Sequence, residues 1–168
     1  MQKKQLIHSY CRKFKMGGLS AGLDQMLIEA ETNSISYLEY TINLFQAEAL
    51  HREYNDAQKR LKVARLPRFH DLNSYDHTFE NGLSKTSLNQ LRELNWLDQI
   101  YNIILMGPSG IGKTFLAAGL CADAIQKGYK AYFRTMEEII NMLKLKEFTA
   151  TAMADYKRLN KANLIVID

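Results

Sequence analysis

The sequence is poor in cysteine and proline and has no long apolar run, and each shortage argues against a class of protein. Its 168 residues include two cysteines and two prolines. Cys11 and Cys121 lie far apart and belong to no C-x-x-C pair, which argues against a disulfide framework and a cysteine zinc site. No run reaches the roughly 18 apolar residues of a membrane span, and no apolar stretch follows the basic N-terminus as in a signal peptide. The sequence therefore predicts a soluble, cytoplasmic protein.

Positive charge is in modest excess and is concentrated in the first part of the chain. The formal net charge is +4. Residues 1–68 hold eleven Lys and Arg against seven Asp and Glu, whereas residues 69–168 hold eleven of each. An acidic partner such as DNA is therefore expected to bind the first part. A solvated basic helix face is the alternative, and the composition leaves both open.

The first 68 residues read as a small, basic, all-α region. Apolar residues at helical spacing follow a candidate N-cap at Ser20. A second helix is predicted from Ser36, where Ser36-x-x-Glu39 has the form of a capping box, and Pro67 is expected to end it. Its apolar stripe consists of Leu38, Ile42, Phe45 and Ala49.

Residues 69–168 alternate between strand and helix patterns. Residues 68–86 lack periodicity and are interpreted as a connection. Strands are predicted at 101–106, 130–135 and 163–168, and helices at 87–97, 113–127, 136–146 and 150–162. This alternation is typical of an α/β domain with a parallel sheet.

The stretch from Gly107 to Thr114, GPSGIGKT, matches the P-loop pattern G-x-x-x-x-G-K-[ST] at every fixed position. Glycines let consecutive backbone N–H groups point at phosphate oxygens. Lys113 would bring a positive charge to the β and γ phosphates, and Thr114 a hydroxyl to Mg²⁺. The following helix would direct its positive dipole end at the same anion. A predicted strand before the loop and a predicted helix after it favour this interpretation over a turn without a ligand.

Asp168 ends the apolar segment NLIVID, about fifty residues beyond the P-loop. A carboxylate at the end of a buried strand has the Walker B form and could hold Mg²⁺ through water. We therefore predict a Mg²⁺ site formed by Thr114 and Asp168, with Lys113 and Asp168 as the catalytic candidates.

With these motifs in view, the chain resembles the IstB-like ATP-binding proteins, which are AAA+ helpers of insertion-sequence transposition related to bacterial helicase loaders. The resemblance rests on RLKVARLPRFHDL, LRELNWLDQIYNIILMGPSGIGKTFLAAGL, AIQKGYKAYFRTMEEIINML and NLIVID, from about residue 60 onward. It implies that ATP and Mg²⁺ bind at the loop and that Asp168 is the first Walker B acid. The candidate nucleotide-binding residues are Gly107, Pro108, Ser109, Gly110, Ile111, Gly112, Lys113, Thr114 and Phe115.

The resemblance also implies DNA and a transposase as partners, and a homo-oligomer in the family. DNA contact is expected through basic residues of the 1–68 region, with 69–168 as the N-terminal part of a P-loop NTPase domain. The chain stops at Asp168, before the next acidic residue, the sensor residues and the arginine finger of the family pattern, so we do not expect it to hydrolyse ATP alone. The AAA+ strand order 5-1-4-3-2 implies a C-terminally incomplete sheet, in which strand 101–106 lacks both neighbours. A marginal, aggregation-prone chain is expected, and a sharp cooperative melt would contradict this.

Three other interpretations stay open on the sequence. The first is a replicative helicase loader with the same ATPase core, the second a small-molecule kinase, and the third a non-catalytic remnant. Pull-down with a transposase or a helicase separates the first, and turnover of a small acceptor would indicate the second. Side chains that could line an adenine pocket, or simply pack, are Tyr75, Phe79 and Trp96. The histidines show no metal-ligand spacing and are interpreted as surface or capping residues: His8, His51, His70 and His77.

Overall fold

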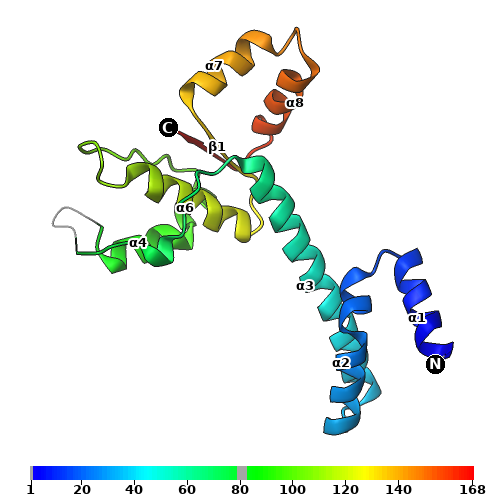
Figure 1. Cartoon of the computed structure of the whole chain (residues 1–168). Helices are drawn as coiled ribbons and strands as arrows, with labels where there is room; N and C mark the ends of the chain where they lie inside the picture. The colour runs from blue at the N-terminus through cyan, green and yellow to red at the C-terminus, as the bar shows by residue number, and fades with distance from the viewer. Residues whose placement is uncertain (1, 79–82) are drawn as a thin grey trace. The chain divides into compact units, whose positions relative to one another are not determined.

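The structure is a computed structural model that describes residues 2–78 and 83–168 (Figure 1). The chain forms two compact units, Met1–Asp56 and Ala57–Asp168, and each is described by itself. Phe79 lies outside the described residues. None of the helices that the structure describes is both long enough and apolar enough to cross a membrane.

The first unit contains helices α1 (Gln2–Lys13), α2 (Gly17–Asn33) and the part of α3 (Tyr37–Ala64) up to Asp56. Its core is formed by Cys11, Leu19 and Leu23, with Leu44 of α3 packed against them. The predicted start of α3 is confirmed, because the Ser36 hydroxyl accepts a hydrogen bond from the Glu39 amide (3.2 Å). The small core leaves much of this unit's apolar surface exposed.

The predicted N-cap at Ser20 is wrong, and a side chain from another helix explains why. Helix α2 begins at Gly17, and the Ser20 hydroxyl instead lies 3.0 Å from Nδ1 of His8. The buried Glu48 carboxylate accepts hydrogen bonds from the amides of Gly18 (2.8 Å) and Leu19 (3.1 Å). It thereby satisfies donors at the start of α2 that a local cap would otherwise satisfy.

The Glu48 carboxylate is held ionised by its partners. Burial alone would raise its pKa, but hydrogen bonds from Arg52, Leu19 and Gly18 outweigh burial and lower the pKa below its ordinary value. The Arg52 Nε atom lies 2.6 Å from the carboxylate. Because the folded-state pKa is lowered, the stabilisation is present above the ordinary carboxyl pKa and is lost as the pH falls through the lowered one.

Replacing Glu48 with Gln is expected to loosen the start of α2. The neutral amide keeps the shape but weakens the hydrogen bonds to two helix amides and to Arg52, at a cost of roughly 1–2 kcal/mol. Hydrogen exchange of a peptide covering Gly17–Leu23 should quicken about tenfold at neutral pH, and much less in acid, where Glu48 itself is protonated. The exposed Glu31→Gln is the matched control. Equal exchange in the two variants would contradict the capping role.

The apolar stripe predicted on α3 does not form a core. Leu38 and Phe45 are 73% and 62% exposed, and Ile42 and Ala49 are exposed as well. The face of α3 directed at α2 is the one with Leu44, Glu48 and His51. A Cβ on Gly18 would lie 2.4 Å from the Cβ of His51, so glycine is required where the two helices meet.

The second unit is built around helix α6 (Lys113–Gln126), which packs against strands β1 (Ala131–Arg134) and β2 (Leu164–Ile167). The strands pair in parallel, with Ala131 opposite Leu164 and Arg134 opposite Ile167. Helices α7 (Met136–Leu145) and α8 (Ala150–Leu159) connect them and lie side by side (Figure 1). Before α6 come the 3₁₀ helix η1 (Leu72–Ser74) and helices α4 (Lys85–Glu93) and α5 (Asn95–Asp98).

Most elements predicted for this unit are confirmed, including strands β1 and β2 and the helices α7 and α8 between them. The predicted helix 87–97 is interrupted, because Leu94 adopts a left-handed conformation (φ 65°) between α4 and α5. A mixed helical chain with a small parallel sheet is therefore shown.

The predicted strand at residues 101–106 is wrong. Among the described residues the sheet has two strands, β1 and β2, and residues 101–106 pair with neither. A cavity of about 380 Å³ is lined both by residues 101–105 and by Leu164–Asp168. A strand forms only with a hydrogen-bonded neighbour, and here the cavity lies where that neighbour would be. The apolar pattern of the segment does not indicate whether a neighbouring strand is present.

Candidate functional site

The loop before α6 has the backbone of an anion site. Gly107, Gly110 and Gly112 have φ values of 150°, 86° and 88°, which side-chain-bearing residues rarely adopt. A Cβ added at Gly110 or Gly112 would meet no atom within 4 Å, so these positions require glycine for its backbone freedom and have open space beside them. Gly112 also caps α6 without a side chain, which leaves the first amides of the helix free to bind an anion.

Lys113 is held against the loop that precedes it. Its Nζ atom donates to the carbonyl oxygens of Gly107 (2.9 Å) and Pro108 (2.6 Å). The ammonium group is thus placed over the loop with two of its three donors directed at backbone oxygens. A phosphate oxygen binding here would compete for those donors.

Thr114 and Asp168 lie far apart in the sequence and meet at the start of α6. The Thr114 hydroxyl donates to Oδ1 of Asp168 over 2.9 Å. Asp168 directly follows β2, and its amide donates to the Arg134 carbonyl oxygen (3.1 Å) while its own carbonyl accepts from Met136 (3.2 Å). The strand pairing therefore positions the carboxylate.

The residues at this site have the chemistry that Mg²⁺ and nucleotide phosphates require. Mg²⁺ prefers oxygen ligands, and a hydroxyl and a carboxylate oxygen 2.9 Å apart can contribute to one coordination shell, directly or through water. The glycine loop and Lys113 provide donors and positive charge next to them. These residues fit a Mg²⁺–phosphate group.

The other candidate residues surround this centre or pack behind it. Ser109 is exposed, and Ile111 covers Gly107, since a Cβ on that glycine would lie 2.4 Å from its Cδ1 atom. Phe115 points into a core cluster and stacks on Tyr75, with ring centroids 6.4 Å apart. Tyr75 also lines a cavity of about 260 Å³ that Gly112 and Lys113 share. Trp96 donates its Nε1–H to the Leu91 carbonyl and packs on the main core, and it also lines the cavity of about 380 Å³ that Lys113 and Asp168 share.

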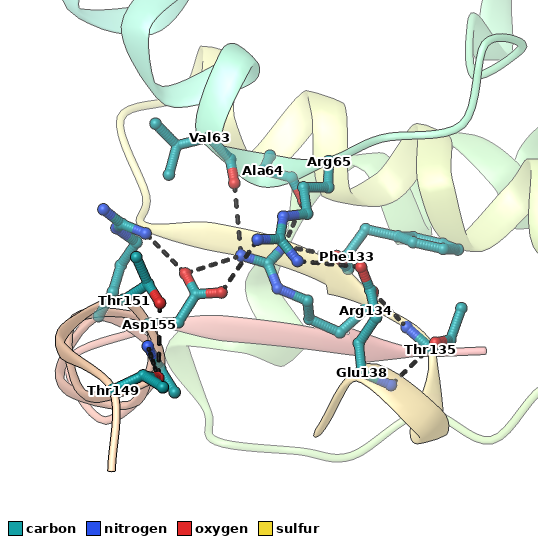
Figure 2. A network of polar contacts seen from close by, with 12 residues as sticks. Val63, Ala64, Arg65, Phe133, Arg134, Thr135, Glu138, Thr149, Thr151 and Asp155 are labelled. Atoms are coloured by element: carbon teal, nitrogen blue, oxygen red, sulfur yellow. Dashed lines mark hydrogen bonds and ion pairs between the residues drawn. The ribbon is translucent and has the colours of Figure 1, made fainter. Parts of the chain in front are cut away.

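Sequence reasoning missed Arg134, which ends β1 beside Asp168. Figure 2 shows its guanidinium directed at the end of α3, where it donates to the carbonyl oxygens of Ala64 (2.9 Å) and Val63 (3.4 Å). The side chain is 2% exposed, and Asp155 of α8 lies 3.6 Å away. The signal in the sequence was an arginine that ends the apolar segment AYFR, but nothing in the sequence indicates its partners.

A second arginine completes this network. Arg65 binds Glu138 (2.9 Å) and Asp155 (3.2 Å), and Glu138 also forms a capping box with Thr135 at the start of α7 (Figure 2). The ends of α3, β1 and α7 are thus joined by charged hydrogen bonds. This network holds the β1 end to which Asp168 is bonded.

Known proteins resemble this chain over nearly its whole length. The family described as IstB-like ATP binding protein matches residues 9–168. A protein named for an IS21-like insertion sequence of Bacteroides fragilis is 43% identical over 99% of this chain and 63% of its own length. A second, from strain YCH46, is 40% identical over 99% of this chain and 83% of its own length, and one named for IS5376 of Geobacillus stearothermophilus is 29% identical over 98% and 66%. The chain thus spans less than two thirds of the length of the first of these relatives and more than two thirds of the length of the second. A match over nearly the whole chain and a P-loop that meets a carboxylate at the end of β2 make this chain a member of the IstB-like ATP-binding proteins.

Proposed function

We propose that this protein is an AAA+ type P-loop protein that binds ATP with Mg²⁺ and DNA, and that assists a transposase. The observation that carries the nucleotide part is the contact between Thr114 and Asp168 across 54 residues of sequence, beside Lys113. Membership of the family implies nucleotide binding, and this geometry supports ATP with Mg²⁺ as its form.

Each residue of the loop has a distinct task in this proposal. The glycine backbone and the first amides of α6 bind phosphate oxygens, and Lys113 moves its donors from the Gly107 and Pro108 carbonyls to the β and γ phosphates. Thr114 and Asp168 hold Mg²⁺, which supplies charge to neutralise the phosphates. Tyr75 is positioned to border the base, because the cavity it lines reaches Gly112 and Lys113.

Charge favours the second unit as the DNA-binding part. Ala57–Asp168 holds sixteen Lys and Arg against eleven Asp and Glu, whereas Met1–Asp56 holds six against seven. The surplus comes from residues 57–68, which have basic residues and no acidic ones. Lys62 and Arg68 are exposed there, and the Arg68 guanidinium lies over the ring of the exposed Phe69 (5.5 Å). Exposed cations beside an aromatic ring suit a nucleic-acid backbone and its bases.

Transposition is the favoured setting, because the relatives are named for insertion sequences. In this setting the proposed partner is a transposase. The family resemblance also implies that copies of the protein form a homo-oligomer. Pull-down with a transposase against a replicative helicase separates this proposal from helicase loading.

Duplex DNA binding tests the proposal directly. We expect the chain to bind a fluorescent duplex, more tightly with ATP and Mg²⁺ than without them, and the double variant Lys62→Glu/Arg68→Glu to bind at least about tenfold more weakly with a shallower salt dependence. The matched control is Lys144→Glu/Lys157→Glu, which changes two exposed cations of α7 and α8. A similar loss in both variants would refute a DNA site at residues 57–68. Equal DNA affinity with and without ATP would refute the coupling between nucleotide binding and DNA binding.

A further inference from the structure

The first unit separates its charges along the chain. Residues 1–16 carry five Lys and Arg and no acidic residue. Residues 17–56 carry seven Asp and Glu and a single basic residue, Arg52. The unit as a whole is almost neutral, yet its α1 part is strongly basic and its α2–α3 part strongly acidic. Surfaces of opposite charge on one unit are complementary between two copies.

The basic part also exposes an apolar face. Leu6, Tyr10 and Phe14 recur every fourth residue along α1 and the turn after it, and all three are exposed. The rings of Tyr10 and Phe14 stack with centroids 6.1 Å apart, and Nζ of Lys13 lies 5.9 Å from the Phe14 centroid. Lys3 falls on the same helix face by its spacing. Helix α1 packs on the rest of the unit through the buried Cys11.

The acidic part exposes a matching apolar face on α3. This is the stripe of Leu38, Ile42 and Phe45, which the core of the unit leaves uncovered. Glu39 and Glu53 lie on the neighbouring stripe by helical spacing and are exposed. At about 1.5 Å per residue, Glu39 and Glu53 are about 21 Å apart along α3, and Lys3 and Lys13 about 15 Å apart along α1. The acidic pair is thus spaced about 6 Å, or roughly one helical turn, more widely than the basic pair, and the two helix faces carry opposite charge.

We propose that α1 of one copy packs on the exposed stripe of α3 in a second copy. The apolar side chains would be covered at the centre, and Lys3 and Lys13 would face Glu39 and Glu53 at the rim. A second copy is favoured over DNA as the occupant because DNA would satisfy the lysines but leave Leu6, Tyr10 and Phe14 in water. The proposal concerns Met1–Asp56 alone and depends on neither nucleotide nor DNA binding.

Sedimentation of the full chain without nucleotide tests this interface. The unmodified chain should associate as its concentration rises, and added salt should weaken the association. The double variants Lys3→Glu/Lys13→Glu and Glu39→Lys/Glu53→Lys should each associate at least about tenfold more weakly, and an equimolar mixture of the two should regain association. Lys144→Glu/Lys157→Glu is the control for a change of net charge, and circular dichroism checks that each variant keeps its helices.

A cross-link provides a measurement that needs no loss of function. Tyr10→Cys and Phe45→Cys are placed in separate copies, and a short bis-maleimide is added to the mixture. The two native cysteines are buried. A heterodimeric product much stronger than either variant forms alone supports the pairing of α1 with α3. A monomeric chain at every concentration would overturn the proposal. So would association that both charge reversals leave unchanged, or a loss of DNA binding without loss of association in Lys3→Glu/Lys13→Glu.

Discussion

Replacing Lys113 with Ala is expected to abolish saturable binding of a fluorescent ATP analogue in the presence of Mg²⁺. The donors of this lysine contact the loop backbone itself, through the Gly107 and Pro108 carbonyls. Losing its charged hydrogen bonds to phosphate should cost at least about 3 kcal/mol, or about a hundredfold in affinity. Equilibrium titration by fluorescence anisotropy measures the change.

The control and a second variant sharpen this experiment. Lys144→Ala removes an exposed lysine from α7 and should leave the affinity unchanged. Asp168→Asn should weaken binding only when Mg²⁺ is present, because its carboxylate is assigned to the ion and contacts Thr114 rather than the loop. Equal binding by Lys113→Ala and the unmodified chain would mean that the loop does not hold phosphate. If Asp168→Asn lost the same affinity for the ATP analogue with and without Mg²⁺, a metal-binding role for Asp168 would be contradicted.

Replacing Arg134 with Met is expected to destabilise the second unit by about 3 kcal/mol. Methionine fills much of the volume, but the carbonyl oxygens of Val63 and Ala64 lose their donors and Asp155 loses a partner. Burial lowers the pKa of the Arg134 guanidinium, opposed by the nearby Asp155, so the charge is present at a desolvation cost that only its partners offset. Urea unfolding should show a lower midpoint.

The matched control for this variant is Arg158→Met. Arg158 also binds Asp155, at 2.6 Å, but its side chain is 40% exposed, so its removal should cost less than about 1 kcal/mol. Trp96 is the single tryptophan of the chain and packs on the core of the second unit, so its fluorescence follows this unit alone. Similar urea midpoints for the two arginine variants would show that burial of the network contributes nothing to the stability of the second unit.

Short-range features of this protein were readable from the sequence, because they depend on a few neighbouring residues. The glycines, lysine and threonine of residues 107–114 predict a loop that opens a helix, and α6 begins at Lys113 as expected. Ser36 and Glu39, three residues apart, predict the start of α3, and the Ser36 hydroxyl accepts a hydrogen bond from the Glu39 amide. The β-branched and aromatic segments at 131–134 and 164–167 form strands because each finds the other as a partner.

Tertiary structure decided the features that depend on partners distant in the sequence. Within the part of the chain that the structure describes, residues 101–106 have a strand's composition but pair with no neighbour. The apolar stripe of α3 lies outside the core because the face with Leu44 and Glu48 is the one directed at α2. The sequence predicts that Thr114 and Asp168 meet, but their contact depends on the parallel pairing of β1 and β2, which brings the end of one strand to the start of α6. Propensity and capping act over one or two helical turns, whereas burial and strand pairing depend on what the rest of the chain brings alongside.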